Sequence, residues 1–476
     1  MCRPMEQLSR RISSIVGEPY VSTDGDIIED ASHDATFITS RPQIVARPED
    51  TEQVGAVVAA AYQAGIPITT RGAGTGLSGG AVPLHGGLVI ITDRLTTLEV
   101  DETSMCARVG AGVITGDLQT AAQAKGLMYP PDPASLARCT IGGNIATNAG
   151  GPSCLKYGVT AEYVLGLTVV LAEGKVITTG GRTRKRSAGY RLSQLFVGSE
   201  GTLGVVTEAF MRLIPRPPHR GGLLASFETT DSAAASVVAL LRSGHLPVAC
   251  ELIDRSSLRF VADLLPPDVD EGSALVLVEQ DGHDRAALMD EIRHMGSICA
   301  TYQGAVTLLP DEADRESLWA ARRAIGARLV ERRSNRLPED IAVPLAQIPS
   351  MVAAIHRICE QEGVDVSIFG HAGDGNLHPS ILFDDQDQQT LARVTRASAQ
   401  IFREAIALGG TVSAEHGLGA LKREFAMEDA SESSLELMSQ IKKLLDPSGL
   451  LNPSKIFPSD PAPEDFLRAL PGWGDS

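Results

Sequence analysis

The sequence lacks long hydrophobic runs and paired cysteines. No uninterrupted apolar stretch approaches the roughly 20 residues that a membrane-spanning helix needs, and the opening MCRPMEQLSRRISSIVG lacks the apolar core of a secretory signal. The seven cysteines never form a Cys-x-x-Cys pair, which argues against a structural zinc finger and against an iron–sulfur cluster on this chain. Isolated thiols in odd number are typical of a reducing compartment, so we expect a cytoplasmic protein. Peripheral association with the inner face of a membrane through a partner stays open.

Positive charge is also scarce. Acidic side chains outnumber basic ones, 59 to 42, and the formal net charge is −17. A surface of that sign repels phosphate backbones, so we expect no nucleic-acid partner. The segment Arg182-Thr-Arg-Lys-Arg186 is a basic exception, and the composition still allows local basic pockets for an anionic substrate.

The first half of the chain alternates strand and helix signals. QIVARP and the residues from Ile66 to Thr70 predict strands, and TEQVGAVVAAAYQAG between them predicts a helix that ends at Gly65. This order indicates an α/β arrangement. Pro215-Arg-Pro-Pro218 is stiff and incompatible with a helix, so we expect a domain boundary there.

Beyond that boundary, strands and helices follow in an order compatible with a ferredoxin-like unit. We therefore expect an α+β protein with two main domains. The predicted parts are an N-terminal arm at 1–40, a first domain at 41–217, a second domain at 218–416, a helical segment at 417–460 and a flexible tail at 461–476.

A glycine-rich segment follows the second predicted strand. Arg71-Gly-Ala-Gly-Thr-Gly-Leu-Ser-Gly-Gly80 carries five glycines in ten positions, and such a segment can present backbone N–H groups to a pyrophosphate at close range. It is not a Rossmann fingerprint, because Pro83 and Gly86 prevent a helix after it, and it lacks the Gly-Lys-Ser/Thr of a P-loop. Taken alone, such a loop is as often structural as functional.

Four more segments of the same domain offer turns and exposed amides. They are Pro130-Pro-Asp-Pro133, Ile141-Gly-Gly-Asn144, Thr147-Asn-Ala-Gly-Gly151 and Val197-Gly-Ser-Glu-Gly-Thr-Leu-Gly204. Several amide-rich loops in one domain indicate a large ligand with a diphosphate and a flat ring.

The segment IFGHAGDGNLHPSIL places two histidines around an Asp-Gly pair. If Asp374 and Gly375 form a two-residue type I′ turn, His371 and His378 face each other across two strands. Their Cβ atoms would then lie about 5 Å apart, and both imidazoles could bind one divalent metal ion. Further along, Glu415 offers a third ligand and His416 a group for proton transfer. The alternative is a pair of polar histidines on a surface hairpin.

Taken together, these motifs resemble the FAD-linked oxidase family with the vanillyl-alcohol-oxidase type of FAD domain. Within it, the chain is most similar to the flavin subunit of glycolate oxidase and to the D-lactate and D-2-hydroxyglutarate dehydrogenases. The resemblance covers nearly the whole chain and rests on RGAGTGLSGG, PDP, IGGN, NAGG, GSEGTLG, the Trp-x-x-Arg that ends at Arg322, GHAGDGNLHP, EHG and GLLNPSK.

The resemblance implies a fold and a set of site residues. The fold is a two-subdomain FAD-binding domain of the PCMH/VAO type, a ferredoxin-like substrate domain and C-terminal helices that return to the FAD domain. The implied FAD-binding residues are Arg71, Gly72, Ala73, Gly74, Thr75, Gly76, Leu77, Ser78, Gly79, Pro131, Asp132, Ser135, Gly142, Gly143, Asn144, Gly150, Gly151, Glu200, Gly204, Val205 and Asn452. His371, His378 and Glu415 would hold the metal, His416 would be the acid/base, and Arg322 would grip the substrate carboxylate. Arg322 could alternatively be a charge on a helix surface.

The implied activity is the oxidation of a small D-2-hydroxy acid, glycolate or D-lactate, to the 2-oxo acid by metal-assisted deprotonation and hydride transfer to flavin N5. We expect FAD to be dissociable, because the histidine closest to the glycine loop is His85. Zn is the expected metal, with Mn and Fe as alternatives. The expected partner is a separate electron acceptor, which could be an iron–sulfur subunit, a cytochrome, a quinone-linked protein or a soluble carrier; a homodimer stays open.

Two positions depart from the pattern expected for 2-hydroxyglutarate. Pro338 stands where we would expect an extra basic residue, and Ser380 stands where we would expect an asparagine after the second metal histidine. Both departures favour a smaller acid over D-2-hydroxyglutarate. The rival readings are a metal-free FAD alcohol oxidase that uses O₂, and a flavin-binding subunit whose catalysis resides in a partner.

Overall fold

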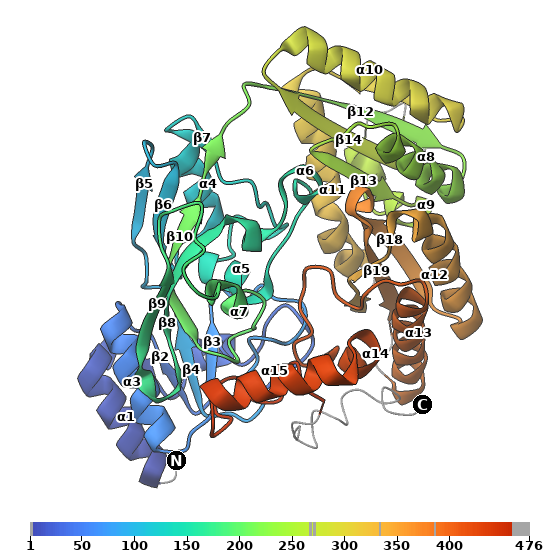
Figure 1. Cartoon of the computed structure of the whole chain (residues 1–476). Coiled ribbons are helices and arrows are strands. Elements are labelled where there is room, and N and C mark those ends of the chain that lie inside the picture. Colours follow the sequence, from blue (N-terminus) through green and yellow to red (C-terminus); the bar gives the residue numbers. More distant parts are fainter. Residues whose placement is uncertain (1–2, 266–268, 270–272, 333–334, 385–386, 459–476) are drawn as a thin grey trace. The chain divides into compact units, whose positions relative to one another are not determined.

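The structure is a computed structural model that describes residues 3–265, 269, 273–332, 335–384 and 387–458 (Figure 1). These residues divide into two compact units. Unit 1 contains 3–150, 159–216 and 415–458, and unit 2 contains 151–158 and the described part of 217–414. The chain enters unit 2 for the second time within the proline-rich segment and leaves it after Ala414. The tail predicted for 461–476 lies outside the described residues.

The first sheet of unit 1 has the strand order β1-β2-β4-β3, with β2, β4 and β3 parallel. Helix α3 connects β2 to β3, begins after Asp50, whose side chain accepts the N–H of Gln53, and is followed by Gly65 with a φ of 65°. The predicted strand–helix–strand order is thus confirmed. The elements are α1 (Arg3–Val16), β1 (Val21–Ser22), α2 (Asp26–Asp30), β2 (Ile44–Ala46), α3 (Thr51–Gln63), β3 (Ile68–Arg71) and β4 (Leu88–Ile91).

The second sheet of unit 1 is antiparallel, with the order β5-β6-β10-β8-β9. Its strand β10 alternates buried and half-buried side chains, as a strand with one face on a core should. The remaining elements of unit 1 are β5 (Leu98–Asp101), β6 (Cys106–Gly110), α4 (Thr115–Gln123), β7 (Leu127–Met128), α5 (Ile141–Thr147), β8 (Val164–Val170), β9 (Val176–Gly180), α7 (Ser193–Phe196), β10 (Val205–Arg212), β11 (Ile214–Pro215), α14 (Ala426–Asp429) and α15 (Glu432–Leu445).

Unit 2 is built on one antiparallel sheet with the order β15-β12-β14-β13-β18-β19-β16, and β17 also pairs with β19. Its elements are α6 (Cys154–Tyr157), β12 (His219–Phe227), α8 (Thr230–Arg242), β13 (Ala249–Ile253), α9 (Arg255–Leu258), β14 (Ala274–Gly282), α10 (Arg285–Thr301), β15 (Ala305–Leu309), α11 (Glu312–Arg332), β16 (Asn335–Pro338), β17 (Ile341–Ala342), α12 (Ile348–Glu362), β18 (Asp365–Gly370), β19 (Asn376–Phe383) and α13 (Gln388–Ala407). Helices and antiparallel strands together confirm the predicted α+β class.

Both faces of the central strand β14 are buried, which explains its almost continuous apolar sequence. Leu275 and Leu277 share a hydrophobic cluster with Leu318 and Trp319 of α11. Because side chains alternate along a strand, Val276 points to the opposite face, and α8 and α10 contact β14 as well. This packing fixes β13, the neighbour of β14, in the interior of the unit.

The histidine hairpin forms, but the predicted type I′ turn is wrong. Strands β18 and β19 pair in a register that places Phe369, not His371, opposite His378. Asp374 ends a short 3-10 turn, and only Gly375 of the pair has a positive φ, 87°. A type I′ turn needs positive φ at both central positions, so a longer connection forms instead. The two rings still approach each other, with centroids 5.0 Å apart.

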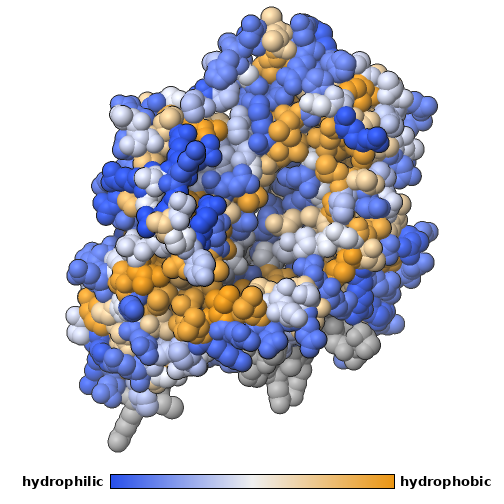
Figure 2. Space-filling view, viewed as in Figure 1, coloured by the Kyte–Doolittle hydropathy of each residue, from blue (hydrophilic) through white to orange (hydrophobic). Residues whose placement is uncertain are grey.

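The face shown in Figure 2 contains both hydrophobic and hydrophilic residues. Hydrophobic residues gather in a band over unit 1, and strongly hydrophilic residues lie above that band. No helix among the described residues is both long and apolar enough to cross a membrane.

Candidate active site

A cavity in unit 1 is lined by most of the predicted cofactor segments. These segments come from the glycine-rich loop after β3, the stretch before α5, α5 itself and the loop before β10. The predicted residues that line it are Gly72, Ala73, Gly74, Thr75, Gly76, Leu77, Ser78, Ser135, Gly142, Gly143, Asn144, Gly150, Glu200 and Gly204. Glu415 and His416 line the same cavity.

Other predicted cofactor residues are not on the wall of this cavity. Among the described residues of unit 1, those not on the wall are Arg71, Gly79, Pro131, Asp132, Val205 and Asn452, and Gly151 belongs to unit 2. Arg71 is buried and donates Nη1–H to the carbonyl oxygen of His33, and burial lowers its pKa. The wall also contains residues next to the motifs that we did not predict, including Thr140 and Phe196.

Close packing explains two glycines of the loop. A Cβ atom on Gly72 would lie 2.4 Å from Oγ1 of Thr140, and Gly74 has a φ of 67°. A side chain at Gly74 would also meet the Arg71 guanidinium. These positions therefore need glycine to bring the backbone against the cavity.

The segment Ile141-Gly-Gly-Asn144 does not form the turn that we expected. It is the first part of the short helix α5, because the Thr140 side chain accepts the N–H of Gly143 and caps the helix. Asn144 is buried, and its Nδ2 donates to Oγ1 of Thr115 over 2.7 Å. Because Gly142 and Gly143 have no side chains, the backbone of α5 itself lines the cavity at these two positions.

Two cavity loops hold the segment that carries Glu415 and His416. Oγ of Ser78 donates to the carbonyl oxygen of His416 over 3.0 Å. The Glu200 carboxylate accepts the N–H of Leu418 through Oε1 at 2.9 Å and the N–H of Gly419 through Oε2 at 2.8 Å. His416 therefore stands on a backbone that is anchored to the cavity wall.

The C-terminal segment ties the same loops together. Nδ2 of Asn452 donates to the carbonyl oxygens of Gly80, at 2.9 Å, and Glu200, at 2.7 Å. Nζ of the buried Lys455 donates to the carbonyl oxygen of Val82. Asn452, which we predict to bind the cofactor, thus joins two loops that line the cavity.

Glu200 and Lys455 have strongly shifted pKa values. Burial raises the pKa of Glu200 to about 7, against the opposing effects of the Leu418 and Gly419 N–H groups and of Lys455. Burial lowers the pKa of Lys455 to about 7, while Asp34 and Glu200 oppose that shift. The loop that carries His416 is therefore held by a carboxylate whose charge depends on its neighbours.

In unit 2, the buried carboxylate of Glu251 on β13 joins two predicted site residues. Nε of Arg322 donates to Oε2 of Glu251 over 2.7 Å, and Oε1 lies 2.5 Å from Nδ1 of His371. Burial alone would raise the pKa of Glu251, but the charges of His371 and Arg322 bring it down to about 2. A proton on Nδ1 of His371 leaves Nε2 as the ring atom that can bind a metal.

A second buried carboxylate, Asp340, lies beside His378. Its Oδ1 is 3.5 Å from Nδ1 of His378 and accepts Nδ2–H of Asn376 over 2.7 Å. Its Oδ2 accepts the backbone N–H of Ala414 over 2.8 Å. Glu415 is the next residue, with its Cα about 3.8 Å from that of Ala414. The hydrogen bond to Asp340 therefore fixes the backbone directly before Glu415.

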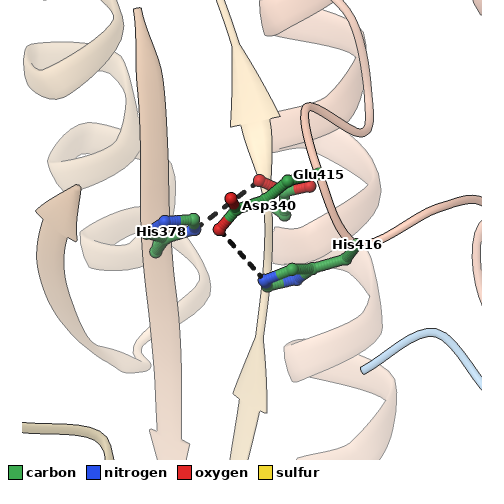
Figure 3. Close-up of side chains that lie close together, drawn as sticks. All are labelled: Asp340, His378, Glu415 and His416. Carbon is green, nitrogen blue, oxygen red and sulfur yellow. Dashed lines mark ion pairs between the residues drawn. The ribbon is translucent and has the colours of Figure 1, made fainter. Parts of the chain in front are cut away.

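Figure 3 draws the side chains of Asp340, His378, Glu415 and His416, each of which can offer one ligand atom to a metal ion. Asp340 and His378 belong to unit 2, and Glu415 and His416 belong to unit 1. Imidazoles and carboxylates are ligand types that Zn²⁺ and other divalent first-row metals accept. Two of the three predicted metal ligands, His378 and Glu415, are among these four residues, together with the predicted acid/base His416. The third predicted ligand, His371, is not among them, although its ring contacts that of His378. Sequence reasoning missed Glu251 and Asp340 as site residues.

Comparisons with known proteins identify the family of this chain. The profile of FAD linked oxidases, C-terminal domain, matches residues 216–456, and the profile of an FAD binding domain matches residues 42–180. The chain belongs to the FAD-linked oxidase family. It is thus an FAD-dependent oxidoreductase, and most residues that line the cavity in unit 1 lie in the part that the FAD-binding profile matches.

Relatives with named activities cover almost the whole chain. The chain is 40% identical to the glycolate oxidase subunit GlcD of Bacillus subtilis over 90% of this chain and 92% of that protein. It is 34% identical to the subunit GlcD of Escherichia coli strain K12, over 94% and 89% of the two chains. It is 36% identical to a D-lactate dehydrogenase of Archaeoglobus fulgidus, over 87% and 91%.

Solved structures show the same fold at low sequence identity. A 4-ethylphenol oxidase from Gulosibacter chungangensis has a TM-score of 0.78 at 21% identity and covers 96% of this chain and 98% of its own. p-Cresol methylhydroxylase has a TM-score of 0.78 at 17% identity, over 96% and 97% of the two chains. The predicted PCMH/VAO type of fold is confirmed.

Proposed function

We propose that this FAD-linked oxidase oxidises a small D-2-hydroxy acid, glycolate or D-lactate, to the corresponding 2-oxo acid. Its relatives are named for glycolate oxidation and D-lactate dehydrogenation. One structural observation carries the proposal: Glu415 and His416 line the cofactor cavity, and the residue before them is hydrogen-bonded to Asp340, the carboxylate beside His378. The chain itself thus connects the flavin site to the metal-ligand candidates.

Bound FAD would accept the hydride from C2 of the substrate, and a divalent metal held by His371, His378 and Glu415 would act as a Lewis acid on the C2 hydroxyl. The residues of the chain supply the rest. His416 takes the hydroxyl proton, for which its imidazole is suited near neutral pH. Its anchorage through Ser78 and the loop bound by Glu200 fixes where that proton goes.

Arg322 binds the substrate carboxylate. Its Nε is used by Glu251, while its terminal Nη groups have no hydrogen-bond partner among the residues that the structure describes. The guanidinium carbon also lies 4.6 Å from the centroid of the Phe369 ring, which holds the plane of the group. An Arg fixed in this way offers two parallel donors to one carboxylate.

The two departures from the pattern of 2-hydroxyglutarate enzymes support a small substrate. Pro338 on β16 and Ser380 on β19 are directly paired in the sheet of unit 2, and Ser380 is buried. The position where we expect a basic residue and the position where we expect an asparagine thus form one cross-strand pair, and neither Pro338 nor Ser380 carries a positive charge for a second carboxylate. This favours glycolate or lactate over a dicarboxylic acid.

The test is anaerobic bleaching of the bound flavin by D- and L-lactate, glycolate and D-2-hydroxyglutarate, with and without a chelator. We expect glycolate or D-lactate to bleach the flavin fastest, and chelation to stop bleaching without releasing FAD. Rapid bleaching by D-2-hydroxyglutarate alone would contradict a small substrate and would instead support a D-2-hydroxyglutarate dehydrogenase. Full activity of a sample that contains no metal would leave a metal-free oxidase as the better reading.

A further inference from the structure

The segment 182–191, between β9 and α7 in Figure 1, is a compact patch of positive charge on a negatively charged protein. We call it the basic loop. Between Glu173 and Glu200 the sequence contains six lysines and arginines and no acidic residue, although the whole chain has a net charge of −17. The basic members of the loop are Arg182, Arg184, Lys185, Arg186 and Arg191.

These charges face solvent and lack acidic partners. Arg184 donates to Sδ of Met105, and Arg186 donates to the carbonyl oxygen of Gly180. Within the described part of the chain, no ion pair involves either of them or Lys185. Arg182 differs, because it lies over the Phe210 ring and its charge acts on Asp101. The positive charge of the other residues is thus available to a binding partner.

The basic loop also frames a cavity of its own. Arg184, Lys185, Arg186 and Arg191 line it together with Tyr190, a residue that is 94% exposed. A concave basic surface with an exposed aromatic ring has the composition of a protein-binding surface, in which Tyr and Arg are enriched. A flat anionic membrane would not enter such a cavity.

This second cavity shares a wall with the FAD cavity. Ser193, the first residue of α7, lines the basic cavity, and Phe196, the last residue of the same helix, lines the FAD cavity. Three residues of helix rise only about 4.5 Å. The two cavities are thus separated at this point by about one turn of α7.

We propose that the basic loop is the docking surface for an acidic electron-acceptor protein. This rests on the proposed function, in which each turnover leaves two electrons on the cofactor. Two one-electron acceptor molecules each take one electron, and two protons pass to water. Attraction at the loop opposes the repulsion between two proteins of negative net charge.

Because attraction at the basic loop and repulsion between the net charges have opposite effects on how affinity depends on salt, the salt dependence of binding tests the proposal. The probe is oxidised cytochrome b5, an acidic haem protein, and its binding to the oxidised holoenzyme is measured by NMR titration at low and moderate salt. Net repulsion predicts that affinity increases with salt, whereas docking at the basic loop predicts that it decreases. We expect the triple variant Arg184→Ser/Lys185→Ser/Arg186→Ser to lower the affinity at low salt about tenfold.

The matched control removes three exposed cations from other elements of unit 1, in Arg10→Ser/Lys125→Ser/Lys443→Ser. It should leave the affinity within about twofold of the parent protein, since docking steered by local charge ignores distant charge. Basic cytochrome c should not lose affinity in the triple variant. If affinity for cytochrome b5 rises with salt, or if both variants lose it equally, the proposal is wrong.

A second measurement reads electron transfer without substrate. The flavin is reduced by light or dithionite, and its reoxidation by cytochrome b5 is followed by stopped flow. The rate constant should fall about tenfold in the triple variant and stay unchanged in the control. Because no hydroxy acid is used, failure here is separate from failure of the proposed function. Loop-dependent binding to phosphatidylserine vesicles with an unchanged reoxidation rate would instead assign the loop to a membrane and overturn the proposal.

Discussion

Arg322 donates its Nε–H to Oε2 of Glu251 over 2.7 Å, and both side chains are buried. The other oxygen of that carboxylate binds Nδ1 of His371. One anion thus orients both the proposed substrate clamp and a proposed metal ligand. A buried carboxylate with two such partners costs more to remove than to keep, because removal leaves a cation unpaired.

Glu251→Gln should weaken metal binding without altering the flavin site. The glutamine amide would present an N–H₂ to Nδ1 of His371, which favours the tautomer with its proton on Nε2 and blocks that ligand atom. We expect metal affinity to fall about 10- to 100-fold, as measured by equilibrium dialysis and metal analysis. The control is Glu279→Gln, which neutralises another buried carboxylate, one that pairs with Arg220 and Arg315 in the same sheet. Equal metal loss in both variants would contradict a specific role for Glu251.

His378→Ala should remove both metal and activity. The side chain lies against the His371 ring and beside Asp340, so its loss leaves the metal with one protein imidazole. We expect flavin reduction by the substrate to slow at least about 100-fold, while the flavin spectrum stays intact. His356→Ala is the matched control, because His356 is half-exposed and pairs with Asp254, away from the His371 and His378 rings. A metal-containing, active His378→Ala protein would remove this residue from the ligand set.

His416→Gln should slow the chemical step and leave cofactor binding unchanged. If His416 takes the hydroxyl proton, the rate of flavin reduction falls about 10²- to 10⁴-fold, while substrate affinity changes little. Stopped-flow reduction over a range of substrate concentrations separates the two. His33→Gln, an exposed histidine of unit 1, should match the parent protein. A variant that binds substrate poorly but reduces its flavin at the parental rate would argue for a binding role.

Lys455→Met should shift the pH dependence of activity to higher pH. The charge of Lys455 lowers the pKa of Glu200, which burial has raised to about 7, so its removal moves that pKa further upward. Glu200 then becomes the anion that holds the Leu418 and Gly419 N–H groups only at higher pH. We expect the acidic limb of kcat/KM, corrected for flavin content, to move up in pH. Lys443→Met, on the exposed side of α15, should leave the limb in place.

Local signals predicted the features that depend on neighbours in sequence. The helix between Asp50 and Gly65 could be predicted from its N-terminal cap and from the glycine that ends it. The glycine-rich loop could be predicted because close packing and a positive φ allow only glycine at positions such as Gly72 and Gly74. The turn of the histidine hairpin was predicted wrongly because Asp-Gly suits two turn types. Asp374 took helical φ/ψ, and the register of β18 and β19 followed the longer connection.

Partners that are distant in sequence could not be predicted. Glu251 binds Arg322 and His371, which lie 71 and 120 positions further along the chain. The residues around Glu251 form an apolar strand, and nothing in that local sequence indicates that its carboxylate has a partner in the folded protein. Asp340 was visible only as one of two acids before a strand, and its hydrogen bond to Ala414 depends on the folded path of the chain. Only topology brings such residues together.

The bonds from Asn452 to Gly80 and Glu200 have a consequence for biosynthesis. The two loops that Asn452 joins both line the cavity in unit 1, and Asn452 follows Glu200 by 252 positions. A nascent chain therefore contains both loops long before it contains the residue that joins them. A chain that is truncated before Asn452 should consequently retain less flavin than the full chain.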